Sequence, residues 1–310
     1  MNREEISVWH FMKASLKCPL RFTPSNLLSP ITVYQLSKYG SKDELGGFLI
    51  WCDGCGLCGE QVFKWIQSLK KSSEYTNQLS NLIKDYELKL VEKGEYLLYI
   101  PELIYNQLKP VFTFMLENLN RIGYNVGLLT GPDSGILYNL MMMDEERQIS
   151  EFTSQLGSYE SETICVDKYT MMILGGVDVK CVSLASFIKR LTLDERIYFK
   201  EFPSIRLLLL RSAYKFYRSE ERTLLNILRI FPNIQIVLSR RRYGLGLSHY
   251  YNESMVREYI SYIRSKVPYK PCLLSTVDPY LYTYIYKFSI HKTSVLTYLP
   301  NLLVSFMESI

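Results

Sequence analysis

Three cysteines stand close together near the N-terminus with the spacing of metal ligands. Cys52, Cys55 and Cys58 form the pattern C-x-x-C-x-x-C and are three of only seven cysteines in 310 residues. In ferredoxins this pattern continues with x-x-x-C, whereas Val62 occupies the fourth place here. Three thiolates can hold an iron–sulfur cluster with one open iron, or a zinc ion completed by a distant cysteine or histidine. The plainer interpretation is that these small residues fill the space around a tight turn.

The same segment has the glycine spacing of a phosphate-binding loop. Gly54 and Gly59 form G-x-x-x-x-G between an apolar run at 48–51, predicted to be a strand, and a predicted amphipathic helix. The lysine and the hydroxyl residue that should follow are replaced by Glu60 and Gln61. A carboxylate at the lysine position repels a triphosphate. The segment therefore has the spacing of a nucleotide site but the wrong charge.

A basic run follows a predicted buried strand in the second half of the chain. Arg240, Arg241, Arg242 and Tyr243 come directly after the apolar run 234–239 and begin a predicted flexible loop. Arginines bind phosphates, and the ring of Tyr243 or Tyr250 is available to stack on a base, so this segment has residue types that contact nucleic acid. The alternative is a solvated loop at the end of a strand.

Predicted strands alternate with predicted helices along most of the chain. This order predicts an α/β fold with a mostly parallel central sheet flanked by helices. Ligands of such sheets bind at the carboxyl ends of the strands, which places the Gly54 loop and the arginine loop at one edge. We find no internal repeat. The predicted strands after the first span 96–100, 125–130, 163–167, 169–174, 205–210, 234–239, 272–275, 284–290 and 295–298, and the predicted helices span 4–16, 62–69, 111–122, 184–191, 220–230 and 253–265.

The composition indicates a globular protein with a sizeable core. Hydrophobic residues make up 47% of the chain, and the net charge of +5 permits contact with nucleic acid without requiring it. No apolar run reaches the roughly 18 residues that span a membrane, and the N-terminus lacks the pattern of a signal peptide, so we expect an intracellular protein. An N-terminal helix and proline-rich linker are predicted at 1–30, and a core at 31–310 with an insertion near 131–165.

With its elements in this order, the chain resembles divergent paralogues of the RecA-like recombinase family. Segment 29–36 resembles the S-T-G-I-x-x-L-D segment of that family, and 46–61 resembles its Walker A motif. Segment 204–220 resembles its Walker B strand with the F/Y-R-S/T-E/D motif that follows, and 304–310 resembles its last strand. The resemblance covers most of the chain after Pro30 and implies a RecA-like P-loop core.

The sequence differs from this family at the residues that bind phosphate and magnesium. Glu60 and Gln61 replace the Walker A lysine and hydroxyl, and Arg211 replaces the Walker B aspartate, so the phosphate and magnesium contacts are lost. The resemblance therefore implies a non-catalytic subunit without a cofactor. Such paralogues act as mediators of DNA repair and homologous recombination, and they bind DNA and a RecA-like recombinase or paralogue in a heteromer. The expected location is the nucleus in a eukaryote and otherwise the cytoplasm.

Two other functions remain open from the sequence. A radical S-adenosylmethionine enzyme would use Cys52, Cys55 and Cys58 as ligands of an iron–sulfur cluster, and 92–98 resembles the G-G-E-P segment of that family. That family spaces its cysteines C-x-x-x-C-x-x-C, and here the first gap is one residue shorter. The third function is that of an α/β interaction subunit that does not bind DNA.

Overall fold

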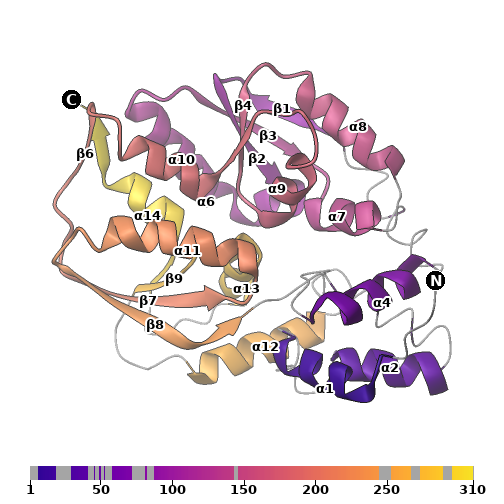
Figure 1. Cartoon of the computed structure of the whole chain (residues 1–310). Coiled ribbons are helices and arrows are strands. Elements are labelled where there is room, and N and C mark those ends of the chain that lie inside the picture. Colours follow the sequence, from indigo (N-terminus) through magenta and orange to yellow (C-terminus); the bar gives the residue numbers. More distant parts are fainter. Residues whose placement is uncertain are drawn as a thin grey trace.

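Two large sheets flanked by helices form the body of the computed structural model, and the described helices near the N-terminus lie to one side (Figure 1). The structure describes residues 6–18, 29–40, 45, 49, 52, 58–71, 81, 87–142, 146–243, 253–266, 273–288 and 295–309. The predicted α/β class, with mostly parallel strands flanked by helices, is confirmed. The described strands form a five-stranded sheet, a four-stranded sheet and a separate two-stranded pair, instead of one central sheet.

The first lobe, residues 87–199, contains a five-stranded sheet in the order β1-β3-β2-β4-β5. The strands β2 to β5 are parallel, and β1 covers the outer edge of β3 in the antiparallel direction. Its strands are β1 (Lys89–Glu92), β2 (Tyr96–Pro101), β3 (Val126–Gly131), β4 (Glu162–Cys165), β5 (Cys181–Ser183) and the separate β6 (Ile197–Phe199), and its helices are α6 (Glu102–Arg121), α7 (Ser134–Met142), α8 (Glu146–Gly157), α9 (Lys168–Leu174) and α10 (Leu184–Leu191).

The second lobe, residues 205–309, contains a parallel four-stranded sheet in the order β10-β9-β7-β8. The run IRLLLL forms most of its central strand β7, as its continuous apolar character predicts. Its strands are β7 (Ile205–Ser212), β8 (Ile234–Tyr243), β9 (Leu273–Thr276), β10 (Val295–Tyr298) and the separate β11 (Met307–Ser309), and its helices are α11 (Lys215–Leu228), α12 (Glu253–Lys266), α13 (Pro279–Lys287) and α14 (Leu299–Ser305).

The two lobes repeat one topology. The order β3-β2-β4-β5 of the first lobe matches the order β8-β7-β9-β10 of the second, and each series ends in a helix and a short separate strand. These last strands, β6 and β11, pair with each other in the antiparallel direction. Helix α6 packs on α14 of the other lobe, and α11 packs on α10. The lobes are therefore joined through equivalent elements, and one apolar core includes buried side chains of both.

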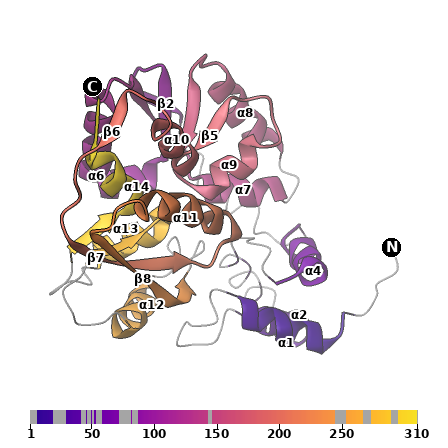
Figure 2. The same ribbon diagram turned by 60° about the vertical axis from the view of Figure 1, so that its left-hand side comes forward.

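The N-terminal helices are α1 (Val8–Lys17), α2 (Pro30–Tyr39) and α4 (Glu60–Lys71), and Figure 2 shows them apart from both sheets. They enclose a small apolar cluster that includes Phe11, Val33 and Ile66. The helix predicted at 62–69 is confirmed as part of α4. Of the strand predicted at 48–51 only Leu49 is described, and it is helical. No helix among the described residues is long and apolar enough to cross a membrane.

Two predicted strands were wrong. Residues 169–174 lie in helix α9, and the described part of 284–290 begins in helix α13. An aspartate caps each helix. Asp167 accepts hydrogen bonds from backbone N–H groups at the start of α9, and Asp278 accepts hydrogen bonds from backbone N–H groups at the start of α13. Because most side chains of both helices are buried, their sequences lack the apolar and polar faces that distinguish a surface helix from a strand.

Candidate functional site

Three aspartates follow strands of the two sheets and lie at their carboxyl ends. Asp133 follows β3, Asp167 follows β4 and Asp278 follows β9. All three are at most 3% exposed, and each accepts a hydrogen bond from a backbone N–H group of the helix that it precedes. In open α/β sheets ligands bind at this edge, so we take the junction of the two lobes as the candidate site.

Hydrogen bonds and rings connect the lobes at this junction. The Tyr280 hydroxyl donates to Asp133 Oδ2 at 3.1 Å, and the backbone N–H of Lys168 donates to the Tyr217 hydroxyl at 3.1 Å. The rings of Tyr169 and Tyr280 meet edge to face, with their centres 5.9 Å apart. The junction is therefore a packed polar network between the two lobes, formed by residues that lie far apart in the sequence.

Lys168 places a cation inside this network. It is 3% exposed, and its Nζ lies 2.9 Å from the centre of the Tyr214 ring and 4.3 Å from that of Tyr169. The electron-rich ring faces attract the ammonium group. The charge of Lys168 also lowers the pKa of Asp278, which offsets part of the effect of burial on that carboxyl group.

Burial raises the pKa of Asp167 and of Asp278. The pKa of Asp167 is raised because its carboxyl group is desolvated, although it accepts hydrogen bonds from the Thr170 and Ser134 hydroxyls. Desolvation raises the pKa of Asp278 to about 6, against the effect of backbone N–H groups and of the Ser212 hydroxyl. The network can therefore take up or release a proton near neutral pH. The N–H groups at these helix starts already bind carboxyl groups, so they offer no open anion site.

A second cluster connects the cysteine segment with the first lobe. Lys70 on α4 is 1% exposed, and its Nζ donates to the backbone oxygen of Cys52 at 2.6 Å and to Asn139 Oδ1 at 2.5 Å. Asn139 lies on α7, whose first residue, Ser134, donates to Asp167 Oδ1 at 2.7 Å. Helix α7 therefore links the cysteine segment to the aspartates of the junction.

The described cysteines of the motif are compatible with a metal cluster. Cys52 and Cys58 are both partly buried and pack against the same apolar cluster of the N-terminal helices. Cys55 and Gly54 lie outside the described residues. Within the part of the chain that the structure describes, no three Cys, His, Asp or Glu side chains are grouped closely enough to hold a metal ion. The donor chemistry, three thiols with two on one apolar surface, fits an iron–sulfur cluster.

The residues after the glycine spacing form the start of a helix. Gly59 has a φ of +89°, which favours glycine, and α4 begins at Glu60. Glu60 is exposed and forms an ion pair of 2.6 Å with Lys64, whose hydrogen bond and charge lower the pKa of the Glu60 carboxyl group. Gln61 is also exposed. This helix start thus carries its own carboxylate, as its dipole favours.

The predicted arginine loop was wrong, because Arg240, Arg241 and Arg242 lie on strand β8. Arg242 donates to the Ser212 backbone oxygen at 2.7 Å and to Glu221 Oε2 at 3.2 Å. Glu221 is 3% exposed, so Arg242 balances a buried carboxylate. Burial raises the pKa of Glu221, whereas a hydrogen bond from the Ser212 N–H and the charge of Arg242 lower it.

The other residues predicted to contact DNA or a nucleotide are dispersed. Tyr243, predicted to stack on a base, is 3% exposed and packs in an apolar cluster of the second lobe. The guanidinium of Arg241 lies over the Tyr262 ring at 5.6 Å, and Arg240 is exposed. Arg211 lies on β7 next to Arg242, where its charge also lowers the pKa of Glu221. Of the four arginines, only Arg211 and Arg242 therefore act on the buried Glu221 carboxyl group.

The junction residues were not predicted from the sequence, although one signal was present. The motif V-D-x-Y occurs as Val166-Asp167-Lys168-Tyr169 and again as Val277-Asp278-Pro279-Tyr280. Each copy stands after the equivalent strand of its lobe, β4 or β9. A repeated polar residue directly after a buried strand would have predicted both the duplication and the site.

Comparisons with known proteins inform the fold alone. No family model matches the chain, and no curated protein matches it. The chain is similar to a crystal structure of a hypothetical protein from Helicobacter pylori, with a TM-score of 0.60 and 10% sequence identity. The similarity covers 96% of this chain and 71% of that protein. This similarity supports the α/β architecture and assigns no activity.

Proposed function

We propose that the chain is an iron–sulfur redox protein whose cluster is held by Cys52, Cys55 and Cys58. The observation that carries this proposal is Lys70, a buried lysine that binds the backbone of Cys52. The ammonium group of Lys70 also donates to Asn139 Oδ1, so its position beside the cysteine segment is fixed. A cluster on three thiolates is anionic, so a fixed cation beside it stabilises the loaded site.

The chain's own residues would position the cluster and connect it to the rest of the protein. Lys70 fixes the carbonyl of Cys52, and Asn139 anchors Lys70 to α7. The apolar cluster beneath Cys52 and Cys58 shields the site from water. When bound, an iron–sulfur cluster supplies one-electron transfer. We expect the electron donor or acceptor to bind at the junction of the lobes, because Ser134 of α7 is hydrogen-bonded to Asp167 there.

Iron and sulfide analysis of protein purified without oxygen tests this function. We expect a broad absorbance band at ~400 nm and several irons per chain. Cys52→Ser, Cys55→Ser and Cys58→Ser should each lose most of the iron, whereas the control Cys181→Ser should keep it. A wild-type protein that stays colourless after anaerobic reconstitution with ferrous iron and sulfide would contradict the proposal.

The reduction potential gives a second readout that depends on Lys70. Lys70→Met removes the buried positive charge and should lower the potential, because the charge favours the reduced, more negative cluster. The neighbouring exposed residue offers a matched control, Lys71→Met, whose potential should change little because water screens an exposed charge. Equal potentials in both variants would remove Lys70 from the proposed site.

The recombination-mediator function predicted from the sequence is a second proposal. Its supporting observation is that Arg240 and Arg241 are exposed at one end of β8. In this function they contact the phosphates of single-stranded DNA, and the partner is a RecA-like recombinase or paralogue. Arg240→Ala combined with Arg241→Ala should weaken binding of a single-stranded oligonucleotide and reduce its salt dependence. Unchanged binding would eliminate this surface.

A further inference from the structure

The outer edge of strand β8 is equivalent to the outer edge of β3, which strand β1 covers in the first lobe. In the first lobe β1 pairs with β3 and closes the sheet. The equivalent strand of the second lobe is β8, and no described strand pairs with its outer side. An uncovered edge offers backbone N–H and C=O groups to another extended segment.

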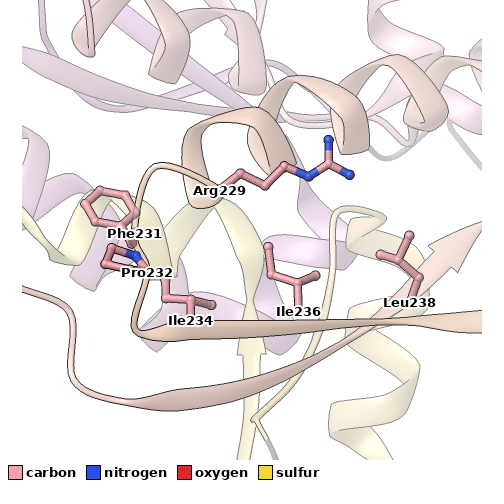
Figure 3. A pocket seen from close by; sticks show the side chains of 6 residues that line it. All are labelled: Arg229, Phe231, Pro232, Ile234, Ile236 and Leu238. Carbon is pink, nitrogen blue, oxygen red and sulfur yellow. The ribbon is translucent and has the colours of Figure 1, made fainter.

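A groove with an apolar floor runs along this edge. It has a volume of about 390 Å³ and lies between β8 and the end of α11. Figure 3 shows Ile234, Ile236 and Leu238 on one side of the strand, with the side chain of Arg229 extending above them. Leu238 is 39% exposed, so the apolar floor is open to solvent. The remaining lining residues are Phe231 and Pro232.

The charges around the groove are positive. Arg229 lines it, and Arg240 stands further along the same strand. Arg222 is exposed and shares a helix face with Arg229, two turns earlier on α11. Strand β8 contains no acidic residue, and the acids of α11, Glu220 and Glu221, are buried. Among the described residues, neither Arg229 nor Arg240 forms an ion pair.

We propose that the β8 edge binds an extended acidic segment of a partner protein, which adds an antiparallel strand as β1 does on β3. The apolar positions lie in the first half of β8 and the arginines in its second half. An antiparallel segment that fits is therefore acidic in its first half and apolar in its second. A second copy of this chain fits less well, because it would bring three further arginines to the edge.

Two synthetic peptides test this surface on the full chain. The first has four alternating aspartates and glutamates followed by four alternating valines and threonines, and the second has the same residues in reverse order. In fluorescence anisotropy we expect saturable binding of the first, and binding of the second about tenfold weaker, or ~1.4 kcal/mol. Equal binding of both peptides, or of neither up to about 1 mM, overturns the proposal.

Two exposed residues provide a matched pair of variants. Leu238→Glu places a negative charge in the groove and should weaken binding of the first peptide about tenfold. Ile230→Glu changes a 71% exposed residue that does not line the groove, and binding should stay within about twofold. Equal effects of the two substitutions overturn the assignment of the groove.

Hydrogen exchange and sedimentation distinguish an acidic partner segment from two other occupants of the edge, a segment of this chain and a second copy of it. Addition of the first peptide should protect amides of β8, which identifies strand addition. Edge amides that are already protected in the monomer without peptide would mean that this chain covers its own edge. A wild-type dimer that Leu238→Glu dissociates would assign the edge to a second copy. Either result overturns the proposal of an acidic partner.

Discussion

Tyr169 and Tyr280 occupy equivalent positions in the two lobes and contact each other edge to face, 5.9 Å between ring centres. Each is the last residue of a V-D-x-Y motif, and the aspartate of each motif caps the helix that contains the tyrosine. The two copies of the repeated topology therefore meet through the same residue. The junction combines this contact with buried aspartates, which makes it sensitive to protonation.

The pKa of Asp278 predicts how stability depends on pH. The folded value of about 6 lies above the ordinary 3.8, so between these values the folded state binds the proton more tightly. This contribution is fully present below about pH 4 and is lost as the pH rises through 6, by about 3 kcal/mol at most. Asp278→Asn should flatten the loss in the free energy of unfolding between pH 4.5 and 7.5, measured by urea titration.

The control for this prediction is a partly buried carboxylate whose pKa shifts in the opposite direction. The pKa of Asp194 is lowered, mainly by hydrogen bonds from Arg196 and Tyr124. Its titration falls below pH 4.5, so Asp194→Asn should leave the change between pH 4.5 and 7.5 as in the wild type. A wild-type slope in Asp278→Asn would show that Asp278 is ionised throughout this range.

The contacts of Lys70 predict that α4 and α7 lose stability together. Lys70→Met preserves the length of the side chain but leaves the Cys52 carbonyl and Asn139 Oδ1 without this donor. We expect a loss of about 1–3 kcal/mol and faster amide exchange in both helices. Lys71→Met should change neither helix. Faster exchange in α4 alone would mean that the bond to Asn139 contributes little.

The elements with a regular apolar pattern could be predicted from the sequence. The runs at 205–210, 234–239 and 295–298 are strands, and those at 184–191 and 253–265 are helices. Burial on one face leaves a period in the sequence, and burial of a strand on both faces leaves a short continuous apolar run. Helices α9 and α13 could not be recognised in this way, because their buried side chains do not alternate with polar ones.

The candidate site was harder to predict, because the fold brings distant residues together. Asp133 and Tyr280 are joined only after two sheets form and their carboxyl ends meet. By contrast, the cysteine motif is local, and its spacing alone suggested metal ligands. The arginines were misassigned for a physical reason: strand β8 continues through them because Arg242 finds a carboxylate partner, Glu221.

This pairing predicts unequal effects of two neighbouring arginines on stability. Arg242→Ala leaves the buried Glu221 carboxylate without its closest cation and should cost about 1.5–3 kcal/mol. Arg240→Ala removes an exposed side chain and should change the free energy of unfolding by less than about 0.5 kcal/mol. Urea titration compares the two variants. Addition of Glu221→Gln to Arg242→Ala should recover part of the loss, and no recovery would contradict the pairing.

The contact between Cys165 and Cys181 predicts that the Cys181 thiol reacts near neutral pH. A hydrogen bond from the Cys165 thiol lowers the pKa of Cys181 from 9.0 to about 7, whereas burial raises the pKa of Cys165. Since the thiolate is the reactive form, alkylation of Cys181 by iodoacetamide should reach half its maximal rate near pH 7. Cys165→Ser keeps a donor and should preserve this midpoint, whereas Cys165→Ala should raise it toward the ordinary value. Peptide mass spectrometry measures the rates, and an unchanged midpoint in Cys165→Ala would show that another group stabilises the Cys181 thiolate.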